Sequence, residues 1–313
     1  MLLNEVLDLF PLLDNPKASG EMIKEYFIKE GATEVNIYSV EGVKGHTDFI
    51  SIKIAGVKGK ENGGSAKTLG IIGRLGGIGA RPERIGFVSD GDGAMAALAA
   101  ALKLIRSKNK GDILYGDVII RTHICPNAPV KPHKPVPFMN SPVDMEVMNK
   151  HEVSEEMDAI ISIDTTKGNN ILNHKGIAIS PTVKEGYILP VSSDLVHIME
   201  QVSGQSCKIL PLSTQDITPY SNNLYHVNSI LQPATATSTP VVGLAITANV
   251  PVAGCATGAS HEVDIALAAA YVIEVAKEFG NNNLEFYNKE EYEKLKSLYG
   301  SMKHLQTRGN IDE

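Results

Sequence analysis

Histidine, aspartate and cysteine side chains stand at the ends of several apolar, β-branched runs in this sequence. Imidazole and carboxylate groups supply the lone pairs that bind a divalent metal such as Zn²⁺, Mn²⁺ or Co²⁺, and the carboxylates also neutralise its charge. A metal held in this way acidifies a bound water and polarises a carbonyl, which is the chemistry of amide hydrolysis. The side chains concerned are those of His46, Asp48, Asp90, Asp92, His123, Cys125, Asp164 and His261.

Each of these residues also has a purely structural explanation when it is taken alone. Asp90 or Asp92 could cap the helix that follows, Asp164 could begin a turn, and His261 could begin a helix. Cys125 precedes Pro126, with no helix start placed to lower the pKa of its thiol, so a buried and unreactive cysteine is favoured there. The metal hypothesis therefore depends on the combination of these residues and on the elements that bring them together.

The first half of the chain predicts two helices, then strands, then a long helix. Two helices are expected within the first 30 residues, followed by strands at 33–40, 48–56, 68–76 and 84–88. The segment GAMAALAAALKLIR is rich in alanine and leucine and has basic residues in its last turns, which indicates a helix. The Ala94–Leu102 part of it is the longest apolar run, at nine residues against the roughly 20 that a membrane span needs.

From residue 116 onward, predicted strands alternate with predicted helices. Strands are expected at 116–122, 158–164, 175–180 and 239–248, and helices at 144–157, 193–204 and 261–280. This alternation predicts an α/β fold with a mixed, mostly parallel sheet sandwiched by helices. We expect a single domain over residues 1–313, with a small strand-rich insertion around 55–85 and a proline-rich loop at 126–142. Ligands of such sheets bind at the carboxyl ends of the strands.

Composition excludes several classes of protein. The 313 residues contain 29 Lys and Arg against 36 Asp and Glu, a formal net charge of −7, which opposes binding to nucleic acid. The amino terminus carries acids where a signal peptide needs basic residues. Three scattered cysteines suit a reducing compartment. We therefore expect a cytoplasmic protein without a membrane or nucleic-acid partner, whose proline-rich loop forms a lid or a contact in a homo-oligomer.

The order of these motifs resembles the superfamily of co-catalytic zinc exopeptidases, which contains the Aeromonas-type leucyl aminopeptidase, the tetrahedral aminopeptidases and the carboxypeptidase G type enzymes. GHTDFISIKI is similar to the His-x-Asp strand of that family, and SDGDGAMAALAAALKL to its Asp before an alanine-rich helix. DAIISIDTT is similar to its apolar strand that ends in Asp, and the segment that ends in GASHEVD to its last ligand loop. The resemblance covers roughly residues 30–280.

The resemblance implies a zinc-exopeptidase-like fold of the phosphorylase/hydrolase-like type and a metal-dependent hydrolase of a small peptide or amide. It implies Zn²⁺, with Mn²⁺ or Co²⁺ as alternatives, and Asp48 as the acid that orients the first metal-bound histidine. The metal ligands that it implies are His46, Asp90, Asp164 and His261. The family has a Glu-Glu pair after the strand that follows the alanine-rich helix, and this sequence instead has RTHICP, with His123 as the remaining candidate for the general base.

Two alternatives remain open at this point. A protein that kept the pocket but lost the base would be a non-catalytic ligand-binding or assembly protein. An amidase that used Cys125 as a nucleophile would be insensitive to chelators. For the substrate, a small molecule or peptide, we expect contacts from His174, which follows the Asp164 strand, and from Thr257 in the small-residue run CATGAS, where backbone amides before a helix could hold an anion.

Overall fold

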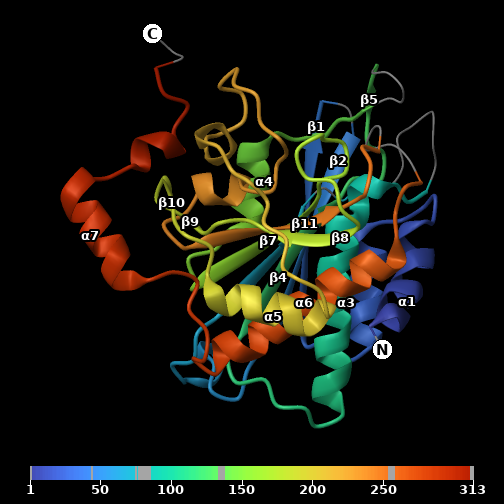
Figure 1. The fold of residues 1–313 in the computed structure, drawn as a ribbon. Coiled ribbons are helices and arrows are strands. Elements are labelled where there is room, and N and C mark those ends of the chain that lie inside the picture. The colour runs from blue at the N-terminus through green and yellow to red at the C-terminus, as the bar shows by residue number, and fades with distance from the viewer. Residues whose placement is uncertain are drawn as a thin grey trace.

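The computed structural model describes residues 2–43, 45–74, 76, 86–132, 138–252 and 258–310. Within them the main element is a nine-stranded mixed sheet (Figure 1). Strands β3, β4, β7 and β11 are parallel to one another, and the remaining strands pair antiparallel. Its order is β1 (Glu34–Gly42), β2 (Gly45–Ile54), β4 (Val118–Ile124), β3 (Leu69–Gly73), β7 (Ala159–Thr165), β11 (Val241–Thr247), β9 (Val183–Lys184) and β10 (Tyr187–Ile188), with β8 (Gly176–Ile179) paired to β11.

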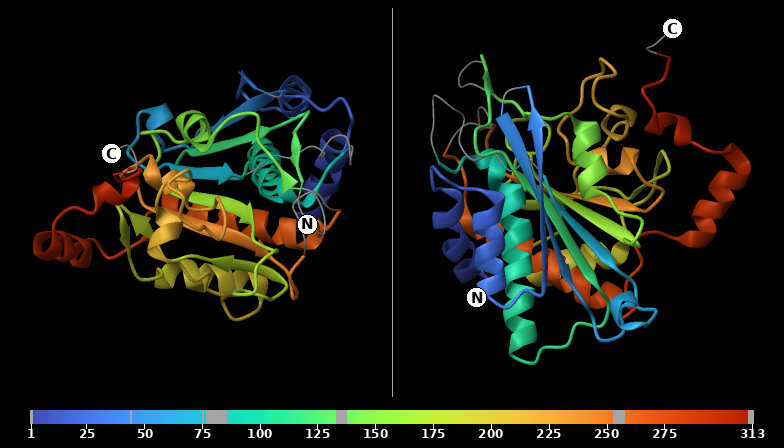
Figure 2. Two further views of the ribbon diagram at one scale, coloured as in Figure 1. Left: turned by 90° about the horizontal axis from the view of Figure 1, so that it is seen from above. Right: turned by 180° about the vertical axis from the view of Figure 1, so that it is seen from behind.

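Helices cover both faces of this sheet, but unequally. One face carries α1 (Leu3–Leu13), α2 (Gly20–Lys29), α3 (Asp92–Asn109), α5 (Ser193–Ser203) and α6 (Glu262–Gly280), and α3 packs against α6 and α1. The opposite face carries α4 (Met145–Glu152) and an irregular segment with the short helices η3 (Thr214–Ile217) and η4 (Gln232–Thr235). Figures 1 and 2 show α7 (Lys289–Tyr299) at one side of the molecule, beyond β9 and β10, where its Tyr292 packs against Tyr187. The remaining small elements are η1 (Lys60–Asn62), η2 (Ser89–Gly91), η5 (Lys303–Gln306) and the paired strands β5 (Val130–Lys131) and β6 (Phe138–Met139).

Neighbouring residues of the central strands contribute to different cores. Ile161 and Ile120 belong to the large core under α3 and α6, whereas Ile160 and Ile119 belong to a smaller core under the irregular segment. This follows from the two-residue period of a strand, which sends successive side chains to opposite faces. The sequences of the central strands are therefore unbroken apolar runs, because both faces of these strands are buried.

Helix α3 approaches the sheet more closely than most side chains would allow. A Cβ at Gly73, the last residue of β3, would lie 2.6 Å from the carbonyl oxygen of Gly93 and 2.8 Å from the Cα of Ala94. Glycine on the strand and small residues on the helix permit this contact. It places the first turn of α3 directly beside the carboxyl end of β3.

The predicted fold class is confirmed: the sheet is mixed, its centre is parallel, and helices flank it. Strand β3 lies between β4 and β7, so it belongs to the main sheet rather than to an insertion at 55–85. The prediction of a strand at 84–88 is wrong for residues 86–88, which form no strand, and its first two residues lie outside the described ranges. Phe87 and Val88 are apolar because they are buried. The predicted helix at 144–157 ends at Glu152.

The proline-rich segment 126–142 contains β5 and β6, and its residues 133–137 lie outside the described ranges. None of the helices in the described part of the chain is both long enough and apolar enough to cross a membrane.

Candidate functional site

Polar residues gather where the parallel strands end. Arg74 follows β3, and His123 and Asp164 are the next-to-last residues of β4 and β7. Because β3, β4 and β7 are parallel, these ends share one edge of the sheet. The short helix η2 (Ser89–Gly91) is joined to the same edge, since the Thr165 hydroxyl donates a hydrogen bond to the carbonyl oxygen of Ser89 at 2.9 Å. This edge is where an α/β sheet binds its ligand.

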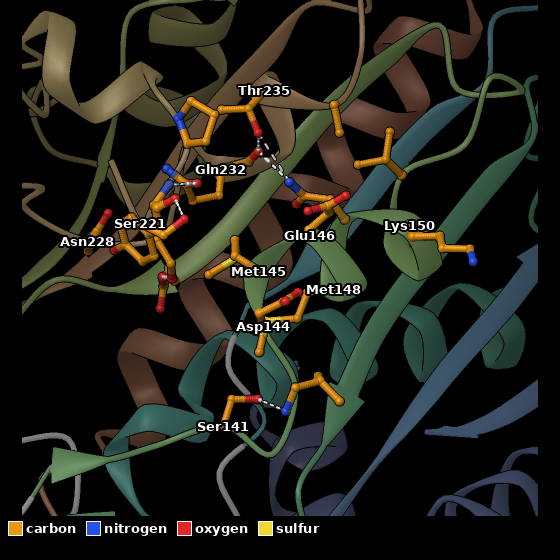
Figure 3. Close-up of a pocket in the computed structure, with 18 of the residues that line it drawn as sticks. Ser141, Asp144, Met145, Glu146, Met148, Lys150, Ser221, Asn228, Gln232 and Thr235 are labelled. Carbon is orange, nitrogen blue, oxygen red and sulfur yellow. Dashed lines mark hydrogen bonds between the residues drawn. The ribbon is translucent and has the colours of Figure 1, made fainter. Parts of the chain in front are cut away.

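A cavity of about 980 Å³ opens at this edge, between α4 and the irregular segment that follows η3. Figure 3 shows Met145 and Met148 of α4 on one side and Ser221, Asn228 and Gln232 on the other, while Lys150 points away from them. The walls include apolar methionine side chains and several amides and hydroxyls. Such a mixture suits a small organic ligand with a few polar groups.

Asp164 lines this cavity and is almost completely buried. Its carboxylate accepts hydrogen bonds from the Ser229 hydroxyl at 2.5 Å and from the Thr165 backbone N–H at 2.7 Å. Burial raises the pKa of Asp164 to about 7, although these two hydrogen bonds oppose the rise. The side chain can therefore gain and lose a proton near neutral pH, as a general acid or base must.

Asp90 lines the same cavity and has a different environment. Across the described residues, no donor or cation pairs with its carboxylate. Burial raises the pKa of Asp90 well above its ordinary value, and the nearby charges of Asp164 and Asp92 raise it further. Two carboxylates with different hydrogen-bond partners thus face one cavity: donors favour the anion of Asp164, whereas no donor among the described residues favours that of Asp90.

A buried ion pair lies beside Asp90. The Lys167 ammonium group contacts the Asp92 carboxylate at 2.5 Å and donates to the carbonyl oxygen of Ala259 at 2.9 Å, and the Ser260 hydroxyl donates to Asp92 at 2.5 Å. Burial raises the pKa of Asp92 to about 6, against the lowering effects of Lys167 and Ser260. This pair joins the first residue of α3 to the loop after β7 and the loop before α6.

A second buried ion pair lies under α4. Arg74 is fully buried, with its Nε 3.1 Å from Glu152 Oε2 and its Nη2 donating to Asn149 Oδ1 at 2.5 Å. The other oxygen of Glu152 lies 2.5 Å from His123 Nδ1. Burial would raise the pKa of Glu152, but Arg74 and His123 outweigh it and hold that pKa below its ordinary value. The segment RTHICP contains no acidic residue. The fold nevertheless brings a carboxylate to His123, that of Glu152 at the end of α4.

The other predicted site residues lie apart from this pair of carboxylates. Both oxygens of Asp48 are in use, one by the Ser39 hydroxyl at 2.6 Å and one by the Gly20 N–H at 2.8 Å, and His46 Nε2 lies 3.6 Å from Asp48. His261 is exposed at the start of α6. His174 Nε2 lies 3.1 Å from the carbonyl oxygen of Ile177. Thr257 lies outside the described residues.

The described side chains do not fit the two-metal centre that the sequence resemblance implies. Within the described ranges, no three His, Cys, Asp or Glu side chains gather closely enough to hold a metal ion. Two protein cations, Arg74 and Lys167, are instead buried at this edge and neutralise Glu152 and Asp92. Of the four implied ligands, the structure brings together only Asp90 and Asp164.

Comparison with known proteins places the chain in a family. Residues 38–309 match the model of the family described as "Protein of unknown function (DUF1177)". The chain belongs to this family. A solved structure with a similar fold is the bottromycin maturation enzyme BotP, at 16% sequence identity and a TM-score of 0.52, with 87% of this chain and 69% of that chain covered. No curated protein matches the sequence. The identity to BotP is low enough that the likeness shows the fold alone.

Several site residues of this DUF1177 protein were missed from sequence. Arg74 lies inside the strand predicted at 68–76, and Lys167 lies three residues after the strand predicted at 158–164, so basic residues near strand ends were the available signal. Glu152 and Ser229 carry no such signal. Glu152 meets His123 from 29 residues away, and Ser229 meets Asp164 from 65 residues away.

Proposed function

We propose that this protein hydrolyses a small peptide or amide in the cavity at the carboxyl edge of the sheet. One observation carries the proposal: Asp90 and Asp164 line the same cavity, and among the described residues hydrogen-bond donors reach only the Asp164 carboxylate. Pairs of this kind divide the roles of acid and base between them. The order of the sequence motifs supports the same class of activity.

The environments assign the two roles. Asp164, ionised because Ser229 and the Thr165 N–H donate to it, accepts a proton from a water molecule as that water attacks the substrate carbonyl carbon. Asp90, neutral because no donor stabilises its anion, donates a proton to the leaving nitrogen as the carbon–nitrogen bond breaks. The hydroxyl of water is transferred to the acyl group and its proton to Asp164, and exchange with solvent restores both carboxyl groups.

His123 is not the base in this proposal. Among the described residues it is not part of the cavity wall, and its Nδ1 is paired with Glu152. Asp48 is likewise occupied by Ser39 and Gly20. These contacts hold α4 and β2 in place, and they suit supporting roles for both residues.

A non-catalytic binding protein is the second candidate. The observation in its favour is that Arg74 and Lys167 are paired with Glu152 and Asp92, which leaves fewer free carboxylates for chemistry at this edge. Such a protein would bind the same small peptides or amides without cleaving them.

An assay of dipeptides, amino-acid amides and N-acyl amino acids separates the candidates. Each substrate is tested after dialysis against EDTA and again with added Zn²⁺, Mn²⁺ or Co²⁺. We expect hydrolysis that survives chelation, because the two carboxylates transfer the protons. Activity that requires a metal would show Asp90 and Asp164 acting as ligands, as the sequence resemblance implies, and would overturn the proton transfers assigned above. Tight binding without turnover under every condition would favour the binding protein.

Replacing Ser229 with Ala should shift the pH profile of hydrolysis. The Ser229 hydroxyl lowers the pKa of Asp164, so its removal raises that pKa and moves the acid limb of the profile, expected near pH 7, to higher pH. The loss of rate will be larger at pH 6 than at pH 8.5. Ser154→Ala, at another serine of the cavity wall, is the matched control and should leave the acid limb in place. An unshifted limb in Ser229→Ala would rule out Asp164 as the base.

A further inference from the structure

Tyr220 is held rigidly at the wall of the cavity by its own segment of chain. Its backbone N–H donates to Gln232 Oε1 at 2.9 Å, and Gln232 Nε2 donates to the carbonyl oxygen of Thr218 at 2.8 Å. Gln232 is almost fully buried in η4, so this clamp is anchored to the body of the protein. The next residue, Ser221, has a φ of 72°, a left-handed conformation that turns the chain sharply there. Figure 3 shows Ser221 beside Gln232 on the wall of the cavity.

The aromatic ring of Tyr220 is fixed as well. It packs edge-on against the ring of His226, with centroids 4.7 Å apart and an interplanar angle of 78°. His226 is itself held, with Nδ1 3.0 Å from the carbonyl oxygen of Leu224 and Nε2 3.1 Å from that of Thr218. A ring clamped at its backbone and on its edge has little freedom left to lose when a ligand binds.

Tyr220 forms part of the wall of the cavity that contains the two carboxylates. Tyr220 lines the same cavity as Asp90 and Asp164, and its hydroxyl has no hydrogen-bond partner among the described residues. Burial raises the pKa of Tyr220 well above its ordinary value, and the charges of Asp164 and Asp90 raise it further. The phenol therefore stays protonated, as a free donor beside the two carboxylates.

We propose that Tyr220 is a catalytic residue of the proposed hydrolysis, whose hydroxyl donates a hydrogen bond to the carbonyl oxygen of the scissile amide. This role rests on the proposed function and extends it from the proton transfers to the stabilisation of the oxyanion. As water adds to the carbonyl carbon, the carbonyl π bond becomes a lone pair on oxygen, and the Tyr220 O–H stabilises that negative charge without giving up its proton. When the carbon–nitrogen bond breaks, the carbonyl reforms and the hydrogen bond weakens again.

The test is Tyr220→Phe, which removes one oxygen and keeps the ring that packs on His226. We expect kcat to fall by about 10²- to 10³-fold, as for other single oxyanion donors, with KM changed by less than about threefold. The affinity of a phosphinic peptide that mimics the tetrahedral intermediate should fall by a similar factor, while the affinity of the product should not. The melting temperature should stay near that of the wild type. Tyr225→Phe, at a tyrosine that is 80% exposed on the same segment, is the control and should leave every value unchanged.

Two results would overturn the role of Tyr220 while the proposed function stands. One is an active wild type whose Tyr220→Phe variant keeps its kcat within about threefold. The other is a rise in KM with kcat unchanged, which would mean that the phenol binds only the ground state. A wild type that hydrolyses no substrate overturns the proposed function itself, and the oxyanion role with it.

Discussion

Asp164→Asn will lower kcat by about 10²- to 10⁴-fold, the range that general acid–base groups contribute. Asparagine keeps the shape of the side chain and can still accept the hydrogen bond from Ser229, but it cannot take a proton from water. Steady-state kinetics at pH 8, with substrate binding measured separately by calorimetry, will locate the defect in the chemical step. Binding should change little, because the substrate loses no large contact area.

The same variant should be more stable than the wild type at high pH. The pKa of Asp164 rises from 3.8 in a free side chain to about 7 in the folded protein. The folded state therefore binds a proton more tightly than the unfolded state, and the stability of the wild type falls as pH rises from about 4 to about 7. Asparagine carries no charge, so the gain in the free energy of unfolding should be small at pH 4 and reach at most about 4 kcal/mol at pH 8. Urea unfolding at both values checks this.

Glu155→Gln is the matched control for this experiment. Glu155 also lines the cavity, but it is exposed, so replacing its carboxylate should change neither kcat nor stability appreciably. An Asp164→Asn variant that is both fully active and unchanged in stability would show that this carboxylate is neither catalytic nor strained by burial.

Arg74→Met will destabilise the protein by about 3–5 kcal/mol, the cost of leaving one partner of a buried ion pair unpaired. Arg74 is completely buried and contacts Glu152 and Asn149, and Glu152 in turn contacts His123. Removing the guanidinium leaves the Glu152 carboxylate without its main counter-charge under α4. Urea unfolding at pH 7.5 will measure the loss.

Two further variants keep this prediction testable, even if Arg74→Met does not fold. Arg308→Met breaks an exposed pair with Glu146, 3.5 Å apart, and should change stability by less than about 0.5 kcal/mol. In the double variant Arg74→Met with Glu152→Gln, the buried anion is also removed, so part of the loss should be recovered. A single variant as stable as the wild type would mean that Arg74 contributes packing alone.

Hydrophobic periodicity predicted most of the elements that build the site. The alanine-rich stretch forms α3, and the apolar runs before Thr122 and Asp164 form β4 and β7. The strand predicted from periodicity is wrong at residues 86–88, where Phe87 and Val88 are buried but the backbone forms no strand. Burial selects apolar residues whether or not the backbone forms a ladder, so an apolar run alone cannot distinguish a strand from a buried loop.

The sequence by itself determined the fold class and the edge of the sheet where chemistry is possible, because strand ends are local features and parallel strands share one edge. It also singled out Asp90 and Asp164 as candidates, as metal ligands. Only the tertiary structure decided their surroundings: Ser229 on one carboxylate, no donor on the other, and Arg74 and Lys167 buried among the remaining acids. Charge, burial and hydrogen bonding depend on residues that come together from distant parts of the chain, and they decide whether a carboxylate acts as a ligand, an acid or a base.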